Sequence, residues 1–278
     1  MRHTALFFLF VFSAVGFTAC SSYEKVLKSD DMKLKEEKAL EYYTDGEYHR
    51  ALPLFEELVS VHKGTQKAEQ FYYYYAYCHY HTDQLLIAAY NFKNFAQTYP
   101  GSQYAEESMF MNAKCYYEMS PRASLDQDNT SKTINETQLF INTYPASTRI
   151  QEANGMIDAM RRKLEKKDYE SAMLYFNMDN YKAAATAFTN LLKKYPDTPM
   201  ADRIAYMALR STYLYAMNSI DEKKPERLEQ TLAGFGQFSA RYPQSKYRRD
   251  AESIRDNAAR QLTKLKHDAS TVTTKTES

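Results

Sequence analysis

The sequence predicts an all-α fold, a right-handed α-solenoid of about five helix–turn–helix repeats. A Tyr-Pro pair recurs four times, as YPGS, YPAS, YPDT and YPQS, at spacings of 45, 51 and 47 residues. Periods in this range are typical of stacked helical arrays rather than of one compact core. Small and large apolar residues recur before each pair, and after residue 20 no apolar stretch approaches the roughly 18 residues of a membrane helix.

Each Tyr-Pro pair marks the end of a helix. Proline has no backbone N–H and moves the residue before it out of the α region, so the helix stops there. The hydroxyl two residues after the proline can accept a hydrogen bond from an N–H that opens the next helix. Four side chains occupy this position, namely Ser102, Ser147, Thr198 and Ser245.

The clearest repeat runs from about Glu165 to Pro196 and resembles the tetratricopeptide (TPR) pattern. Its packing positions carry Ala172, Tyr175, Tyr181, Ala184, Phe188 and Leu191. Extended along the chain, the pattern predicts a solenoid over 32–265, with repeats at about 32–65, 69–102, 106–147, 165–198 and 203–245 and an extra helix at 149–164. The third and fifth repeats carry insertions at 119–131 and 218–226. An unrelated helical bundle is the alternative, but it has no reason to repeat a stop signal in register.

The N-terminus indicates a lipoprotein signal peptide over 1–19. The apolar run from Ala5 to Val15 is too short to span a membrane. The ending Phe17-Thr18-Ala19-Cys20 resembles a bacterial lipobox, with Phe17 where Leu is more usual. This resemblance implies cleavage before Cys20, then a diacylglycerol and an N-acyl chain on that residue. An ordinary secretory signal with a chance cysteine is the alternative.

The residues after Cys20 favour the outer membrane and a periplasm-facing position. Ser21, where some lipoproteins have Asp, resembles lipoproteins sent to the outer membrane, and no acidic run follows directly. Residues 20–31 are expected to tether the lipid to the first helix. The tail 266–278 is expected to be disordered, because it is polar and lacks residues that could form a core.

The charge balance of the chain excludes one class of partner. The sequence has 36 basic and 35 acidic residues. Cleavage of the signal peptide removes one basic residue, Arg2, so the mature chain has no formal net charge. This balance argues against nucleic acid as a partner, because its binding depends on neutralising phosphates.

Cys78 and Cys115 occupy equivalent helical positions in neighbouring repeats. Helix axes 8–10 Å apart would hold them beyond disulfide reach, so both are predicted to be buried thiols, unless the register slips.

No motif predicts catalysis, a metal or another cofactor beyond the lipid. The sequence contains no HExxH, GxxxxGK[ST] or GxSxG motif and no metal-type cysteine spacing. His79 and His81 are two residues apart, and such residues do not face one another on a helix.

The most distinctive surface signal is FYYYYAYCHYH at 71–81. A tyrosine-lined groove suits an extended peptide, because the rings supply apolar area and the hydroxyls pair with backbone groups. An equally good interpretation is that these tyrosines replace leucine in the solenoid core. The predicted groove residues are Tyr43, Tyr73, Tyr77, Tyr80, His81, Phe110 and Tyr117.

A lipobox, a short tether and five TPR-like repeats with YPxS marks together resemble the BamD family of the β-barrel assembly machine. The SPR…LDQ…T segment at 120–130 and the run FINTYPAS at 140–147 also resemble that family. The resemblance covers about 20–265 and implies a non-enzymatic lipoprotein. Its implied partners are a BamA-like barrel protein, other assembly lipoproteins and unfolded outer-membrane proteins. It would place substrate signals in the 73–81 groove and the BamA-like partner at Arg203, and less strongly at Lys246, Arg248 and Arg249.

Three other functions remain open. A Tol-Pal envelope adaptor shares the YPxS mark but would have an N-terminal coiled coil and no lipid. A SusD-like glycan-binding lipoprotein also uses TPR helices, but such chains are longer and use Trp, which is absent here. A peptidoglycan hydrolase would require paired carboxylates or a nucleophile with its base.

Overall fold

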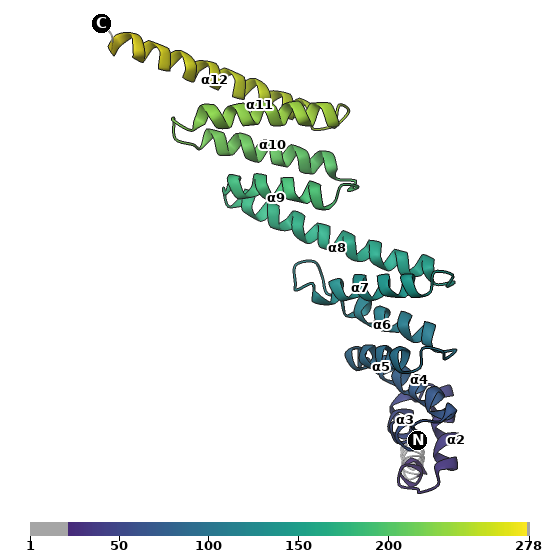
Figure 1. Ribbon diagram of the computed structural model, residues 1–278. Coiled ribbons are helices and arrows are strands. Elements are labelled where there is room, and N and C mark those ends of the chain that lie inside the picture. The colour runs from purple at the N-terminus through teal and green to yellow at the C-terminus, as the bar shows by residue number, and fades with distance from the viewer. Residues whose placement is uncertain (1–21, 277–278) are drawn as a thin grey trace, which may run out of the picture. The chain divides into compact units, whose positions relative to one another are not determined.

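The computed structural model describes residues 22–276, with side chains for 22–267, and these residues are helical throughout, with short connections (Figure 1). The predicted signal peptide and Cys20 lie outside the described residues. The helices are α2 Met32–Thr44, α3 Tyr48–Val61, α4 Gln66–His81, α5 Leu85–Thr98, α6 Ala105–Met119, α7 Asp128–Thr143, α8 Ile150–Asn177, α9 Tyr181–Lys194, α10 Ala201–Met217, α11 Lys224–Arg241 and α12 Arg248–Thr276.

The chain divides into two compact units, with the boundary at Arg161–Arg162 inside α8. In unit 1, each helix from α2 to α6 packs against the next one in sequence. In unit 2, α9 to α12 pack in the same sequential way. Since each helix packs mainly against its sequence neighbours, the predicted all-α fold of stacked helix pairs is confirmed.

The four Tyr-Pro pairs end helices as predicted. The C-caps of α5, α7, α9 and α11 are the four tyrosines, Tyr99, Tyr144, Tyr195 and Tyr242. The Ser or Thr three residues after each tyrosine accepts a hydrogen bond from the backbone N–H two residues further on, at 3.1–3.3 Å. The local chemistry of this motif therefore defines where one helix pair stops and the next begins.

Three of the turns inside the helix pairs use a left-handed residue. Gly46, Asp83 and Asp179 have φ angles of 77°, 61° and 57°. At each turn two backbone N–H groups bond back to the end of the preceding helix, as Gly46 N does to Tyr43 O at 3.1 Å and Glu47 N to Tyr42 O at 2.8 Å. This is the hydrogen-bond pattern of a Schellman C-cap, which reverses the chain within a few residues.

Two expected boundaries differ from the structure. The expected extra helix at 149–164 and the first helix of the fourth repeat form one continuous helix, α8. No Pro or Gly lies between residues 156 and 177 to interrupt it. The expected disordered tail at 266–278 is helical to Thr276, because α12 likewise contains neither Pro nor Gly.

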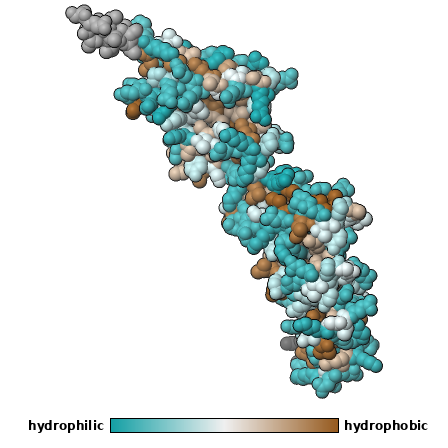
Figure 2. Space-filling model, in the orientation of Figure 1, coloured by the Kyte–Doolittle hydropathy of each residue, from teal (hydrophilic) through white to brown (hydrophobic). Residues whose placement is uncertain are grey.

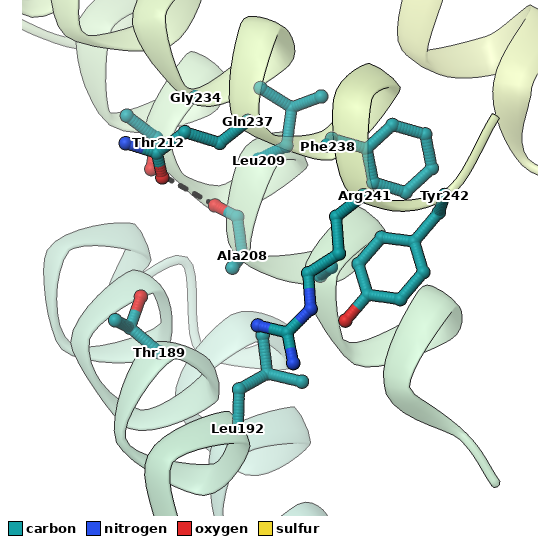
Figure 3. Close-up of a pocket in the computed structure, with 11 residues that line it drawn as sticks. Thr189, Leu192, Ala208, Leu209, Thr212, Gly234, Gln237, Phe238, Arg241 and Tyr242 are labelled. Atoms are coloured by element: carbon teal, nitrogen blue, oxygen red, sulfur yellow. Dashed lines mark hydrogen bonds between the residues drawn. The ribbon is translucent and has the colours of Figure 1, made fainter. Parts of the chain in front are cut away.

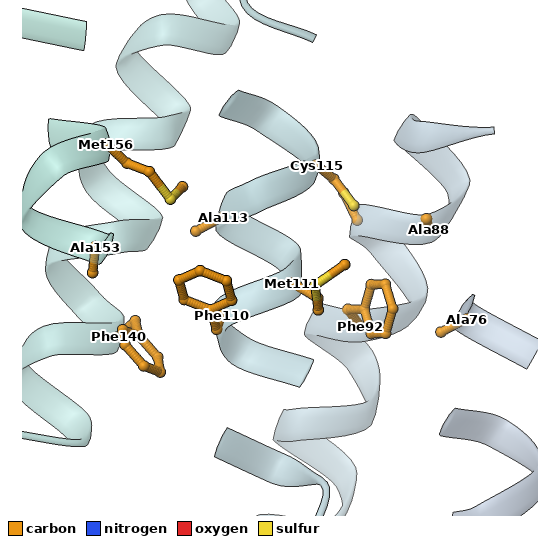
Figure 4. Close-up of a cluster of buried hydrophobic side chains, with 11 residues drawn as sticks. Ala76, Ala88, Phe92, Phe110, Met111, Ala113, Cys115, Phe140, Ala153 and Met156 are labelled. Carbon is orange, nitrogen blue, oxygen red and sulfur yellow. The ribbon is translucent and has the colours of Figure 1, made fainter. Parts of the chain in front are cut away.

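Separate cores hold the repeats together. The largest cluster joins α4 to α8 and includes Phe92, Phe110 and Phe140, each without exposed surface (Figure 4). A second cluster joins α2 to α4 around Phe55 and Phe71. In the view of Figure 2 most of the surface is hydrophilic, and the hydrophobic residues gather in small patches between polar ones.

Candidate binding surfaces

A continuous row of aromatic rings lies on α4 in unit 1. Tyr73 stands at its centre, 4.8 Å from Tyr77 and stacked on Tyr104 of the next repeat at 4.4 Å between ring centroids. Tyr77 contacts both Tyr80 and His81. Tyr43 of α2 joins the row through Tyr74, at 4.6 Å and 5.8 Å. The predicted groove residues Tyr43, Tyr73, Tyr77, Tyr80 and His81 are therefore neighbours in space.

The hydroxyls of this row donate to carboxylates on α6. Tyr77 Oη donates to Glu107 Oε1 at 2.7 Å, and Tyr80 Oη donates to Glu118 Oε1 at 2.6 Å. Arg149 pairs with Glu107 at 2.7 Å. Burial, and then the hydrogen bond to a carboxylate, raise the pKa of both tyrosines, so each hydroxyl keeps its proton. Nothing in the sequence pointed to Glu107, Glu118 or Arg149, because these contacts join residues 30–42 positions apart.

Two predicted groove residues lie elsewhere. Phe110 has no exposed surface; its ring packs on Phe140 at 5.4 Å, and Arg149 covers it at 4.4 Å. Its place in the groove is therefore a wrong prediction, because the face of α6 that carries it turns into the core. Tyr117 is half-buried against the same core.

A depression of about 380 Å³ lies at the turn end of the aromatic row. Tyr48 and His81 form one wall, stacked at 4.1 Å with 13° between their planes. Gly46, Arg50 and Thr82 line the rest of it together with Glu47 and His49. Tyr48 thus extends the aromatic row beyond the residues predicted for the groove.

A second, basic surface in unit 2 is formed by α8, α10 and the connection that leads into α12. The guanidinium of Arg203 lies 5.1 Å from the Tyr169 ring, and that of Arg210 lies 5.1 Å from the Phe176 ring. Between them on α10, Tyr206 stacks on Tyr247 at 5.0 Å with 7° between the planes. The spacing 203, 206, 210 places the three α10 residues on one helix face. This spacing was the available sequence signal for Tyr206 and Arg210, which the prediction of Arg203 alone missed.

The three weaker basic candidates lie in different surroundings. Lys246 Nζ lies 5.2 Å from the Tyr247 ring and so joins the same surface. Arg248 bonds instead to Glu252 at 3.0 Å and to the Pro243 carbonyl. Arg249 is exposed on the first turn of α12.

Cys78 and Cys115 are buried free thiols, as predicted. Burial raises the pKa of each thiol to about 12. Within residues 22–267, no three His, Cys, Asp or Glu side chains come together as a metal site would require. None of the described helices combines the length and apolar character that a membrane crossing needs.

Helix pairs packed one after another along the chain define a helical-repeat protein. Residues 30–224 match the family model described as YfiO, outer membrane lipoprotein. The match covers well over half of the chain, and the chain belongs to this family.

Two curated relatives carry the name outer membrane protein assembly factor BamD. The protein from Caulobacter vibrioides is 22% identical over 153 residues, which is 55% of this chain and 50% of that protein. The protein from Pasteurella multocida is 22% identical over 211 residues, which is 71% of this chain and 80% of that protein. The chain thus spans half the length of the first relative and four fifths of the second.

Among solved structures, the TPR2AB-domain:pHSP90 complex of yeast Sti1 aligns with a TM-score of 0.40 and 14% identity, over 82% of this chain and 98% of that one. A TPR-like repeat protein of a Podospora kinesin light chain aligns with a TM-score of 0.33 and 13% identity, over 77% and 97%.

Family membership confirms three predictions as statements about the family. The chain is a YfiO/BamD-type protein, its family is one of outer membrane lipoproteins, and the family is non-catalytic. The prediction that the chain is not an enzyme is therefore confirmed.

Proposed function

We propose that this protein is a lipid-anchored subunit of the β-barrel assembly machine. It binds a BamA-like barrel protein and unfolded outer-membrane proteins, and it assists their folding and insertion. The observation that carries the proposal is the family match over 30–224, joined by two relatives named as assembly factors. The anchor is the acylated Cys20, and the protein faces the periplasm.

The aromatic row on α4 is the proposed contact for an extended substrate segment. Its rings are half-buried, so they keep a fixed geometry while offering apolar area. The hydroxyls of Tyr77 and Tyr80 already have acceptors, and this supports a substrate contact made mainly by ring faces. The depression beside His81 adds room for one or two side chains.

The basic surface around Arg203 is the proposed contact for the BamA-like partner. Arg203 and Arg210 each lie over an aromatic ring, which restrains the guanidinium and leaves its edge available to a carboxylate. Both arginines are exposed. An acidic patch on the partner is the chemistry that fits this surface.

Affinity purification of the full-length protein from membranes in mild detergent tests the proposal. A large β-barrel protein with repeated periplasmic domains should be recovered in near-stoichiometric amount and identified by mass spectrometry. Cys20→Ala is the control for the anchor. This variant should not be acylated and should be absent from the membrane fraction. Recovery of Tol-Pal components or of a glycan importer in place of the barrel protein would refute the assembly role.

A further inference from the structure

Two successive helix pairs of unit 2 build the same outer depression from matching positions. Equivalent hydrogen bonds set the match: Thr198 bonds to Glu165 of α8, and Ser245 bonds to Asp202 of α10 at 2.8 Å. On this alignment each α8 residue corresponds to the α10 residue 37 positions later. Residues of α9 correspond to α11 residues 47 positions later.

The first depression contains its own carboxylate. It has a volume of about 240 Å³ and lies between α8 and α9. Asp168 accepts hydrogen bonds from Lys194 Nζ at 2.7 Å and from Tyr195 Oη at 2.9 Å. Its lining consists of Asp168, Ser171, Ala187, Asn190, Leu191 and Lys194.

The second depression, between α9, α10 and α11, lacks that carboxylate (Figure 3). Ala205 stands where the first depression has Asp168, while a cation and a tyrosine are kept as Arg241 and Tyr242. The resulting pocket has a volume of about 260 Å³. All six matching positions line it, namely Ala205, Ala208, Gly234, Gln237, Phe238 and Arg241.

The loss of the acid leaves two donors without an acceptor. The Tyr242 hydroxyl is buried and, within the described part of the chain, has no hydrogen-bond partner. Arg241 lies over the Tyr242 ring at 5.6 Å, and among residues 22–267 no carboxylate pairs with it. Buried polar groups are rarely left unpaired in native proteins, so the Tyr242 hydroxyl needs an acceptor, and the exposed Arg241 supplies a positive charge beside it. Figure 3 shows both groups at one end of the pocket, beside Leu192.

We propose that this pocket binds the carboxylate of a Glu or Asp side chain presented by another polypeptide, in the place that Asp168 occupies one repeat earlier. A volume of about 260 Å³ falls below the usual range of small-molecule sites and suits one or two side chains. Leu192 and Leu209 give the pocket an apolar floor, next to which a charged hydrogen bond is stronger than in water.

The pocket is separate from the proposed partner surface around Arg203. Ala205 and Ala208 line the pocket, whereas Arg203, Tyr206 and Arg210 lie on a different face of α10. At 100° per residue, residues 205 and 208 lie well over a quarter-turn from 203 and 206 respectively. The inference therefore stands on the repeat comparison and does not depend on the proposed assembly role.

A pair of short peptides tests the proposal on the purified full-length chain. The probe is Ac-Ala-Leu-Glu-Leu-Ala-amide, and its Gln counterpart is the neutral control. The Glu peptide should shift the NMR signal of the Arg241 side-chain N–H, and the Gln peptide should bind about tenfold more weakly. Arg241→Gln should weaken binding of the Glu peptide by about the same factor, whereas Lys194→Gln, at the matching position with an internal acid, should not.

A second variant keeps the test decisive if Arg241→Gln fails to fold. Ala205→Asp restores the acid of the preceding repeat, so it should block the Glu peptide and raise the midpoint of thermal unfolding. Equal affinity for the Glu and Gln peptides, no binding of either at millimolar concentration, or unchanged binding in Ala205→Asp would each overturn the proposal.

Discussion

At the scale of single residues, the tyrosines of α4 serve packing and surface together. The Tyr77 ring meets Phe92 edge-on at 5.0 Å, while its hydroxyl reaches Glu107 on the next repeat. A phenylalanine would fill the same space but leave Glu107 with one donor fewer. Tyrosine suits these positions because its body is apolar and its tip is polar. The two interpretations of the sequence, groove and core, thus describe two sides of the same rings.

Replacing Tyr77 and Tyr80 by Ala together should weaken the binding of barrel C-terminal peptides about tenfold or more. The variant loses ring area at the proposed contact, and aromatic anchors dominate such interfaces. Fluorescence anisotropy of a labelled peptide measures the loss, and circular dichroism should show retained helicity. Tyr72→Ala is the matched control. Tyr72 lies on the same helix as Tyr77 and Tyr80 but outside the aromatic row, and its ring packs on Phe95 of α5. Equal loss of binding in the control would assign the effect to packing.

The buried thiols should not react while the protein is folded. With a pKa of about 12, the thiolate fraction of Cys78 and Cys115 at pH 8 is roughly 10⁻⁴. In the Cys20→Ala background, a thiol reagent should label neither residue until guanidinium unfolds the chain. Because the folded thiols hold their protons more tightly than the unfolded ones, the free energy of unfolding should fall between about pH 8.5 and pH 12. Rapid labelling of the native protein would contradict the burial.

At the scale of elements, the start of α10 is stabilised more strongly than the start of α6. The Thr198 hydroxyl accepts a hydrogen bond from Met200 N at 3.1 Å and donates to the buried carboxylate of Glu165. The Ser102 hydroxyl accepts from Tyr104 N at 3.3 Å. The hydroxyl that follows the Tyr-Pro pair therefore makes one hydrogen bond before α6 and two before α10.

Thr198→Ala should lower the free energy of unfolding by about 2–4 kcal/mol. The change removes the hydroxyl–backbone hydrogen bond in the turn before α10, worth about 1 kcal/mol, and leaves Glu165 buried without this donor, at about 1–3 kcal/mol. Ser102→Ala, which removes only the hydroxyl–backbone hydrogen bond to Tyr104 N, should cost about 1 kcal/mol or less. Urea unfolding followed by circular dichroism compares the two. Equal losses would show that the Glu165 contact adds nothing to stability.

Elements with a local signal were predictable from the sequence, and their relations in space were less so. Every Tyr-Pro stop was located correctly, because proline and the following hydroxyl act within four residues. The division of α8 at residue 164 came from extending a 34-residue frame, although the local sequence contains no helix breaker there. A repeat frame assigns packing roles but cannot decide whether one helix continues into the next repeat.

The candidate sites were predictable only in part for a similar reason. Five of the seven groove residues are neighbours in space, since helical spacing decides which side chains share a face. Phe110 shares that spacing but turns into the core, because its exposure depends on α7 and α8 packing over α6. The pocket beside Arg241 needed the structure, because it is recognised by a missing acid at a matched position rather than by a motif.

At the scale of the whole molecule, each unit contains its own buried clusters. Phe92, Phe110 and Phe140 belong to unit 1, and Phe188 and Phe238 belong to clusters of unit 2. In a helical array stability is approximately the sum of repeat and nearest-neighbour terms. Damage to one cluster should therefore act mainly on the helices that build it.

Phe140→Ala tests this local character. Removing a fully buried Phe should cost about 3–5 kcal/mol, whereas Leu139→Ala beside it, at 46% exposure, should stay within about 0.5 kcal/mol. Native-state hydrogen exchange should show faster exchange of the amides in α6 and α7 of Phe140→Ala, with α9 to α11 still protected. Since Phe140 contacts Phe110 and Tyr144 within unit 1, no direct packing is lost in unit 2. A uniform loss of protection through α11 would show that the chain unfolds as one cooperative body.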